Sequence, residues 1–151
     1  PHGLKGYFDL EEALECAKEQ NKPIFVDFTG HGCVNCRKME EEVWKDPKVL
    51  SRLRKDYIVV ALYCDDKNIK LKEEEWIKSV RDTTEMLKTL GEINSEYQAI
   101  EFSSNSQPQY ILMGLDGKKL SGVQPRAYNT NIDEFVEFLD AGKTAFDSKF
   151  K

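Results

Sequence analysis

Two cysteines, Cys33 and Cys36, stand three positions apart in this chain of 151 residues, with Val34 and Asn35 between them. A C-x-x-C pair can be a redox dithiol, half of a metal site, or an accident of sequence. In the first case, one thiolate attacks a disulfide sulfur and the second thiol resolves the mixed disulfide that forms. The residues around the pair must decide among these alternatives.

A strand and a helix are predicted on either side of the cysteine pair. Residues 24–29 (IFVDFT) form a nearly continuous apolar run between Pro23 and Gly30, which is typical of a buried central strand. A flexible turn follows, and a helix begins at Cys33. A helix N-terminus offers unpaired N–H groups and a partial positive charge, both of which favour a thiolate. Cys33 is therefore the predicted nucleophile, and Cys36, one turn later, the resolving thiol.

The other expected elements alternate between helices and strands. Helices are predicted over 8–20 (capped by Asp9), 48–55, 92–102 and 132–142, and strands over 57–64 and 109–113. The Asp116-Gly117 pair predicts a turn from the strand 109–113 into a fourth strand over 119–123. Residues 83–90 are ambiguous. This order indicates an α/β protein with a mixed sheet.

Length and composition limit the classes of protein that fit. A chain of 151 residues has room for one domain, which we take as residues 1–151. It contains no apolar run of 18 residues and no signal peptide. The first residue is Pro1 rather than Met, so we expect a domain excised from a larger protein. The net charge is −5 with both signs mixed, which argues against nucleic acid as a partner.

The remaining cysteines and histidines do not complete a metal site. A zinc site needs about four ligands, and besides the C-x-x-C pair the chain offers only Cys16, Cys64, His2 and His31. We expect no metal and no cofactor beyond a Cys33–Cys36 disulfide. Cys16 and Cys64 should behave as small buried apolar side chains, a disulfide between them being the alternative.

Two stretches, FVDFTGHGCVNCRKMEEEVWKDPKVL and NSQPQYILM, resemble the thioredoxin superfamily. The resemblance is strongest to the C-terminal periplasmic domain of DsbD-type thiol–disulfide interchange proteins of Bacteroidetes-type bacteria. It covers most of residues 7–142 and is weak over 66–92. It depends on the dithiol, on Asp27 within an apolar strand, and on Pro108 at the head of a later strand. The implied fold is thioredoxin-like: a mixed sheet flanked by helices, an N-terminal helix extension and an insertion before the cis-proline strand.

The resemblance also implies roles for two carboxylates. Burial should raise the pKa of Asp27, so that Asp27 can take the proton of Cys36 and return it later. Glu40 lies four residues after Cys36 on the same helix face and would tune the cysteine pKa. The alternatives are an Asp27 that reaches solvent and a Glu40 that is solvated like its neighbours Glu41 and Glu42.

Partner binding is expected at residues 34–35 and 107–108. The resemblance implies that Pro108 is cis and shapes a groove facing the dithiol, and that the Gln107 backbone binds an extended partner segment. Val34 and Asn35, between the cysteines, would contact the same partner. A loop proline without such a role is the alternative for Pro108. His31 could stabilise the Cys33 thiolate, but an exposed loop histidine is favoured.

The function implied by the resemblance is protein-disulfide reduction. Cys33 and Cys36 would accept electrons from a membrane-embedded dithiol domain of the same protein and pass them to periplasmic thioredoxin-like proteins, some serving cytochrome c biogenesis. The chain would then be a monomeric periplasmic domain of an inner-membrane protein. The alternatives are a stand-alone thioredoxin-like reductase, a non-catalytic module that holds a client at Pro108, and a metal-binding protein.

Overall fold

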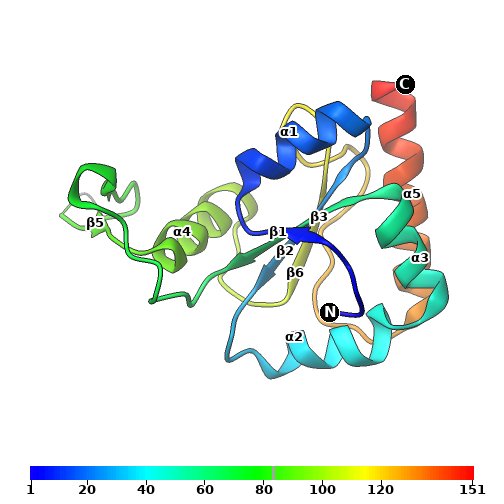
Figure 1. Cartoon of the computed structure of the whole chain (residues 1–151), viewed down its shortest axis with the longest axis horizontal. Helices are drawn as coiled ribbons and strands as arrows, with labels where there is room; N and C mark the ends of the chain where they lie inside the picture. The colour runs from blue at the N-terminus through cyan, green and yellow to red at the C-terminus, as the bar shows by residue number, and fades with distance from the viewer. Residues whose placement is uncertain (83) are drawn as a thin grey trace.

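A computed structural model describes residues 1–82 and 84–151 of the chain (Figure 1). Its centre is a four-stranded sheet in the order β1-β3-β2-β6. The strands are β1 (Gly6–Tyr7), β2 (Ile24–Thr29), β3 (Ile58–Tyr63) and β6 (Gln109–Met113). β1 and β2 run parallel to β3, whereas β6 runs antiparallel to β2. The expected mixed sheet is confirmed, and the short strand β1 adds an edge that the sequence had not indicated.

Helices cover both faces of the sheet (Figure 1). One face, with Val26 and Phe28 of β2, packs against α1 (Leu10–Gln20) and α4 (Leu90–Phe102). The other face, with Phe25, packs against the helices α2 (Val34–Met39), α3 (Pro47–Asp56) and α5 (Ile132–Phe150). Since successive side chains of a strand point to opposite faces, Asp27 lies on the same face as Phe25, under α2.

The helix after the dithiol changes its geometry part of the way along. α2 continues directly into a π-helical segment, Glu40–Trp44. α3 then begins at Pro47, where the Asp46 side chain accepts a hydrogen bond from the backbone N–H of Lys48. Asp46 and Pro47 thus separate α3 from the helix that follows the dithiol. Segments of π-helix frequently occur at functional sites.

The expected insertion lies between β3 and β6. It contains a short 3-10 helix (Glu73–Glu75), a two-stranded ribbon of β4 (Ile77–Lys78) and β5 (Met86–Leu87), and then α4. The ribbon stands at the end of the molecule farthest from α5 (Figure 1). Across residues 1–82 and 84–151, no helix has the length and apolar character needed to cross a lipid bilayer.

Two predicted elements differ from the structure. The fourth strand over 119–123 is wrong, because this segment pairs with β6 through a single isolated bridge, Met113–Lys119. Gly122 at φ +81° turns the chain away from the extended course that a strand needs. The last helix does not stop at Gly142, because α5 runs on to Phe150 and buries Phe146 in the core.

Candidate active site

Cys33 and Cys36 form a disulfide at the start of α2, with their Cα atoms 5.2 Å apart. Cys33 is half-buried, whereas only 1% of the Cys36 surface is exposed. The backbone N–H of Cys36 donates a hydrogen bond to Sγ of Cys33 at 3.1 Å, so Cys33 caps the helix with its own sulfur. A partner can therefore reach Cys33, while Cys36 is accessible only from within the site.

Asp27 is a buried carboxyl on the face of β2 that α2 covers. It is 3% exposed, which excludes the alternative of a side chain reaching solvent. Burial, and secondarily the negative charge of Glu40, raise the pKa of Asp27 to about 8, although the positive charge of Arg37 opposes the shift. Its Oδ1 has no hydrogen-bond partner in the described part of the chain. Asp27 can therefore hold or release a proton near neutral pH.

Glu40 and Arg37 form an ion pair next to Asp27. Oε2 of Glu40 lies 3.1 Å from Nη2 of Arg37, and the Glu40 side chain is only 15% exposed. Glu41 and Glu42, in contrast, are exposed, so Glu40 is not a solvated residue of a charged run. Its backbone N–H still bonds to the carbonyl of Cys36, which keeps Glu40 one turn beyond that cysteine. Its influence on the cysteine pKa remains a prediction.

The Gln107–Pro108 peptide bond is cis, as the resemblance implied. Pro108 directly precedes β6, whose first residue pairs with Phe28 of β2. The start of β6 therefore lies at the same end of the sheet as Thr29, from which the chain leads to Cys33. The Gln107 side chain donates a hydrogen bond to Oε1 of Gln98 on α4 at 2.8 Å.

Cys33 and Cys36 thus lie at the start of α2, Glu40 at its end and Asp27 on the strand face beneath it, with Pro108 at the end of the sheet from which the chain leads to Cys33. The two residues between the cysteines, Val34 and Asn35, are exposed. Exposure makes them available to a partner, and their part in binding stays a prediction.

Asp65, which the sequence had not singled out, holds the loop before the dithiol. Its carboxylate accepts hydrogen bonds from the backbone N–H groups of His31 at 2.8 Å and of Gly32 at 3.1 Å. Although desolvation raises the pKa of Asp65, the bonds from Gly32 and His31 outweigh it, and the pKa falls below its ordinary value. The only available signal was an acidic residue just after a buried strand, which is too common to indicate such a contact.

The next residue, Asp66, binds the same loop through a side chain. Its Oδ2 lies 3.3 Å from Nε2 of His31, whose ring stacks on Tyr63 with 3.9 Å between centroids. The His31 side chain is 54% exposed, as favoured from the sequence. Contacts with Tyr63 and Asp66 nevertheless fix its position.

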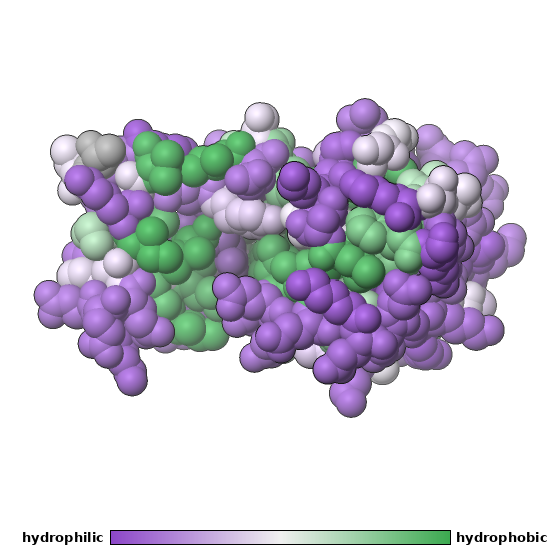
Figure 2. Space-filling view, turned by 90° about the horizontal axis from the view of Figure 1, so that it is seen from above, coloured by the Kyte–Doolittle hydropathy of each residue, from purple (hydrophilic) through white to green (hydrophobic). Residues whose placement is uncertain are grey.

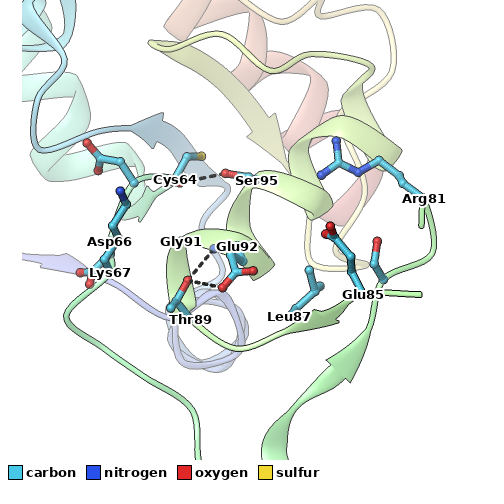
Figure 3. Close-up of a pocket in the computed structure, with 12 residues that line it drawn as sticks. Cys64, Asp66, Lys67, Arg81, Glu85, Leu87, Thr89, Gly91, Glu92 and Ser95 are labelled. Atoms are coloured by element: carbon cyan, nitrogen blue, oxygen red, sulfur yellow. Dashed lines mark hydrogen bonds between the residues drawn. The ribbon is translucent and has the colours of Figure 1, made fainter. Parts of the chain in front are cut away.

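The first two turns of α4 contact the Cys64–Asp66 segment. The Ser95 hydroxyl donates a hydrogen bond to the Cys64 carbonyl at 2.8 Å. Both residues line a hollow of about 270 Å³, in which Figure 3 shows this bond. The Gly91 backbone N–H donates to the Asp66 carbonyl at 3.0 Å, and a Cβ at Gly91 would collide with the Asp66 backbone. α4 therefore supports the Asp65–Asp66 segment from behind.

Cys16 and Cys64 are both free and half-buried, so the alternative of a disulfide between them is not realised. Burial raises the pKa of the Cys64 thiol to about 11. Cys64 is thus a poor nucleophile at neutral pH, in contrast to the position of Cys33 at a helix start.

Comparison with known sequences gives two kinds of match. The family model for thioredoxin-like domains matches residues 5–114. The thiol:disulfide interchange protein DsbD of Vibrio vulnificus strain CMCP6 is 32% identical over 58 residues, which is 38% of this chain and 10% of that protein. The matched part thus spans about a tenth of the length of this curated relative.

Solved structures share the fold at low sequence identity. A DsbH oxidoreductase superposes with a TM-score of 0.64 at 18% identity, over 95% of this chain and 89% of its own. A thioredoxin from Thermus thermophilus superposes with a TM-score of 0.60 at 17% identity, over 90% of this chain and 85% of its own. The oxidised C-terminal domain of Neisseria meningitidis DsbD superposes with a TM-score of 0.56 at 16% identity, over 91% of this chain and 99% of its own. These likenesses confirm the expected thioredoxin-like fold.

Proposed function

This chain belongs to the thioredoxin-like family, and from that premise we propose that it is a thiol–disulfide oxidoreductase domain acting through Cys33 and Cys36. The observation that carries the proposal is the disulfide itself: a half-buried Cys33 bonded to a buried Cys36 at the start of α2, the helix that covers the face of β2 on which the buried Asp27 lies. Each of these groups has a distinct part in exchange.

The reduced domain begins with a thiolate at Cys33. This thiolate attacks one sulfur of a partner disulfide, and the other partner sulfur leaves as a thiolate, which takes a proton. Asp27, with a pKa of about 8, accepts the proton of Cys36. The Cys36 thiolate then attacks Sγ of Cys33, and the partner's second sulfur leaves as a thiolate, which takes a proton from water. Two electrons pass to the partner, and the domain is left with its Cys33–Cys36 disulfide.

We further propose that the domain works as a reductase. Its donor would be a membrane-embedded dithiol domain of the same protein, and its acceptors periplasmic thioredoxin-like proteins. Two observations support this direction: the similarity to a thiol:disulfide interchange protein DsbD, and Val34-Asn35 between the cysteines, where strongly oxidising relatives carry a histidine. A partner segment would lie along Gln107 and Pro108 and contact Val34 and Asn35.

Single cysteine variants test the exchange chemistry. In an assay of disulfide reduction with the purified domain, Cys33→Ser should abolish activity, because no nucleophile remains. Cys36→Ser should accumulate mixed disulfides, since the resolving thiol is missing. Cys64→Ser is the matched control and should retain activity. Full function of Cys33→Ser would instead favour a module that only binds its client.

A redox titration of the Cys33–Cys36 pair tests the direction. A reductase should have a potential near that of thioredoxin, about −270 mV. A potential near that of DsbA, about −120 mV, would refute the reductase assignment while leaving the exchange function intact.

A further inference from the structure

An apolar groove of about 800 Å³ runs between the start of α1 and the inserted segment. We name it the insertion groove. Its apolar lining comes from β1, α1, β3, the insertion and α4: Tyr7, Phe8, Leu10, Leu62, Ile69, Leu71, Ile77, Leu90, Ile93 and Tyr97. None of the proposed exchange residues lies in it.

Large apolar side chains of the insertion groove are open to solvent. Phe8 is 60% exposed, and Ile69 and Ile77 are each 51% exposed. Figure 2, which looks down on the molecule from above, shows hydrophobic surface gathered at the end formed by the insertion, with hydrophilic side chains around it. Removing such apolar surface from water is favourable, so a partner that covers the groove gains binding energy there.

The charges in the insertion groove have a single sign. Glu11 and Glu12 lie on the α1 side and Glu75 on the opposite wall, with Asp9 at the helix start. No lysine or arginine lines the groove in the part of the chain that the structure describes. Complementary potentials across an interface steer encounter and select partners. The complementary occupant is therefore a segment that combines apolar residues with lysine or arginine.

A second hollow links the insertion groove to the loop before the dithiol. This hollow, of about 200 Å³, shares Phe8, Ile69 and Leu90 with the groove and is also lined by His31 and Tyr63. His31 is separated from Cys33 by one residue. A chain that extends from a disulfide held at Cys33 can therefore pass His31 and enter the groove.

We propose that the insertion groove docks an apolar, positively charged segment of the protein whose disulfide exchanges with Cys33. This proposal rests on the proposed exchange function and adds the chemical character of the partner. The groove would select partners by their segment outside the disulfide, whereas the residues at 107–108 would bind the backbone beside it.

Synthetic peptides test the proposal with the reduced domain. Each carries one cysteine as a mixed disulfide with 2-nitro-5-thiobenzoate, joined by a Gly-Ser spacer to a tail of alternating Leu-Lys, Leu-Glu, Leu-Ser or Ser-Lys, or to no tail. Attack on the peptide sulfur releases coloured thiobenzoate. The Leu-Lys tail should raise the second-order rate constant about tenfold over the tailless peptide. The Leu-Glu tail should give no increase.

Groove variants locate the effect, with the ratio of Leu-Lys to tailless rates as the readout. Ile77→Ser should lower this ratio about fivefold, and the exposed Ile100→Ser on α4, outside the groove, should not change it. Replacing Glu11 and Glu12 by lysine should abolish the preference. Replacing Glu15 and Glu19 of the same helix changes the net charge equally and should largely preserve it.

The outcomes separate the two proposals. If the tailless peptide is not reduced, the exchange function fails. If it is reduced but Ser-Lys equals Leu-Lys, the effect is general attraction to an acidic protein, and the groove proposal is overturned. A preference for Leu-Ser over Leu-Lys would overturn the basic character of the partner. A dimer that Ile77→Ser dissociates would assign the groove to a second copy of this chain instead.

Discussion

Asp27 is shielded from water like every other residue of β2, but it differs from them in carrying a group that ionises. Its position within an apolar strand indicated burial before the structure was known, because a carboxylate rarely lies in such a run by chance. No comparable indication in the sequence placed Glu40 and Arg37 close enough to Asp27 to change its pKa. Glu40 stands in a run of three glutamates, and only the packing of α2 separates it from the other two.

Removing the Asp27 charge should stabilise the oxidised domain. Its pKa of about 8 lies above the ordinary value of 3.8, so the folded state resists ionisation and stability falls as the pH rises from about 4 to about 8. Asp27→Asn should therefore match the wild type near pH 4 and exceed it by up to about 4 kcal/mol at pH 7. Urea unfolding at several pH values measures this difference.

The exposed Glu137→Gln on α5 is the control for the Asp27 experiment and should show no such pH dependence. A constant difference between Asp27→Asn and the wild type from pH 4 to pH 8 would mean that Asp27 keeps an ordinary pKa. The same variant should slow release of the mixed disulfide, since Cys36 would lose its proton acceptor.

Asp65 acts through backbone contacts that no local pattern reveals, because it lies 34 positions from His31 in the sequence. Asp65→Asn leaves one carbonyl oxygen where two carboxylate oxygens now accept N–H groups. We expect a loss of about 1–2 kcal/mol at pH 7, modest because the carboxylate is exposed. Its pKa is lowered, so this contribution should vanish as the pH falls through the folded-state value.

Hydrogen exchange monitored by NMR checks the same contacts directly. The amides of His31 and Gly32 should exchange faster in Asp65→Asn, while those of β2 keep their rates. Unchanged protection at both amides would show that the loop before Cys33 is held by other groups.

At the scale of elements, continuous apolar runs predicted β2, β3 and β6 to within a residue or so, because burial on both faces leaves a clear pattern. The buried face of α4 differs from these strands because it contains polar side chains. Its buried side chains include the polar residues Asn94 and Gln98, which bond to the Tyr63 and Ser106 carbonyls. Such long-range bonds leave no trace in the periodicity of apolar residues. That periodicity placed Ile93, Tyr97 and Ile100 on one side of the helix, but the buried positions lie elsewhere and Ile100 is 43% exposed.

Gly142 misled the prediction of α5 for a physical reason. Glycine often ends a helix, but here it lets α5 approach Leu112 and Tyr57, which a Cβ would strike. Gly142→Ala gains helix propensity of about 1 kcal/mol, yet the clash should produce a net loss of about 1–3 kcal/mol. Thermal or urea unfolding measures it. Ser148→Ala, at an exposed position of α5, should be neutral or slightly stabilising; equal effects of the two variants would refute the close packing.

At the scale of the whole molecule, the sheet and the inserted ribbon are held by different forces. β2 is buried along its entire length between two apolar clusters. The segment between the ribbon strands is bound to α4 through Glu96, which accepts hydrogen bonds from the Ser79 hydroxyl at 2.5 Å and the Arg81 backbone N–H at 3.1 Å. A few polar bonds stabilise less than a packed core, so the two parts should open independently.

Native-state hydrogen exchange tests this independence. Some amides are hydrogen-bonded within the insertion, such as Ser79 to the Glu85 carbonyl and Leu71 to the Lys88 carbonyl. The opening free energy of these amides should be several kcal/mol lower than that of the amides of β2 and β3. Glu96→Gln removes the charge that accepts these bonds, so it should lower the opening free energy of the ribbon by about 1–3 kcal/mol without changing that of the sheet. The exposed Glu101→Gln on the same helix is the control. If ribbon and sheet exchange with one common free energy, the insertion is part of the cooperative core, and the groove built on it is as stable as the sheet.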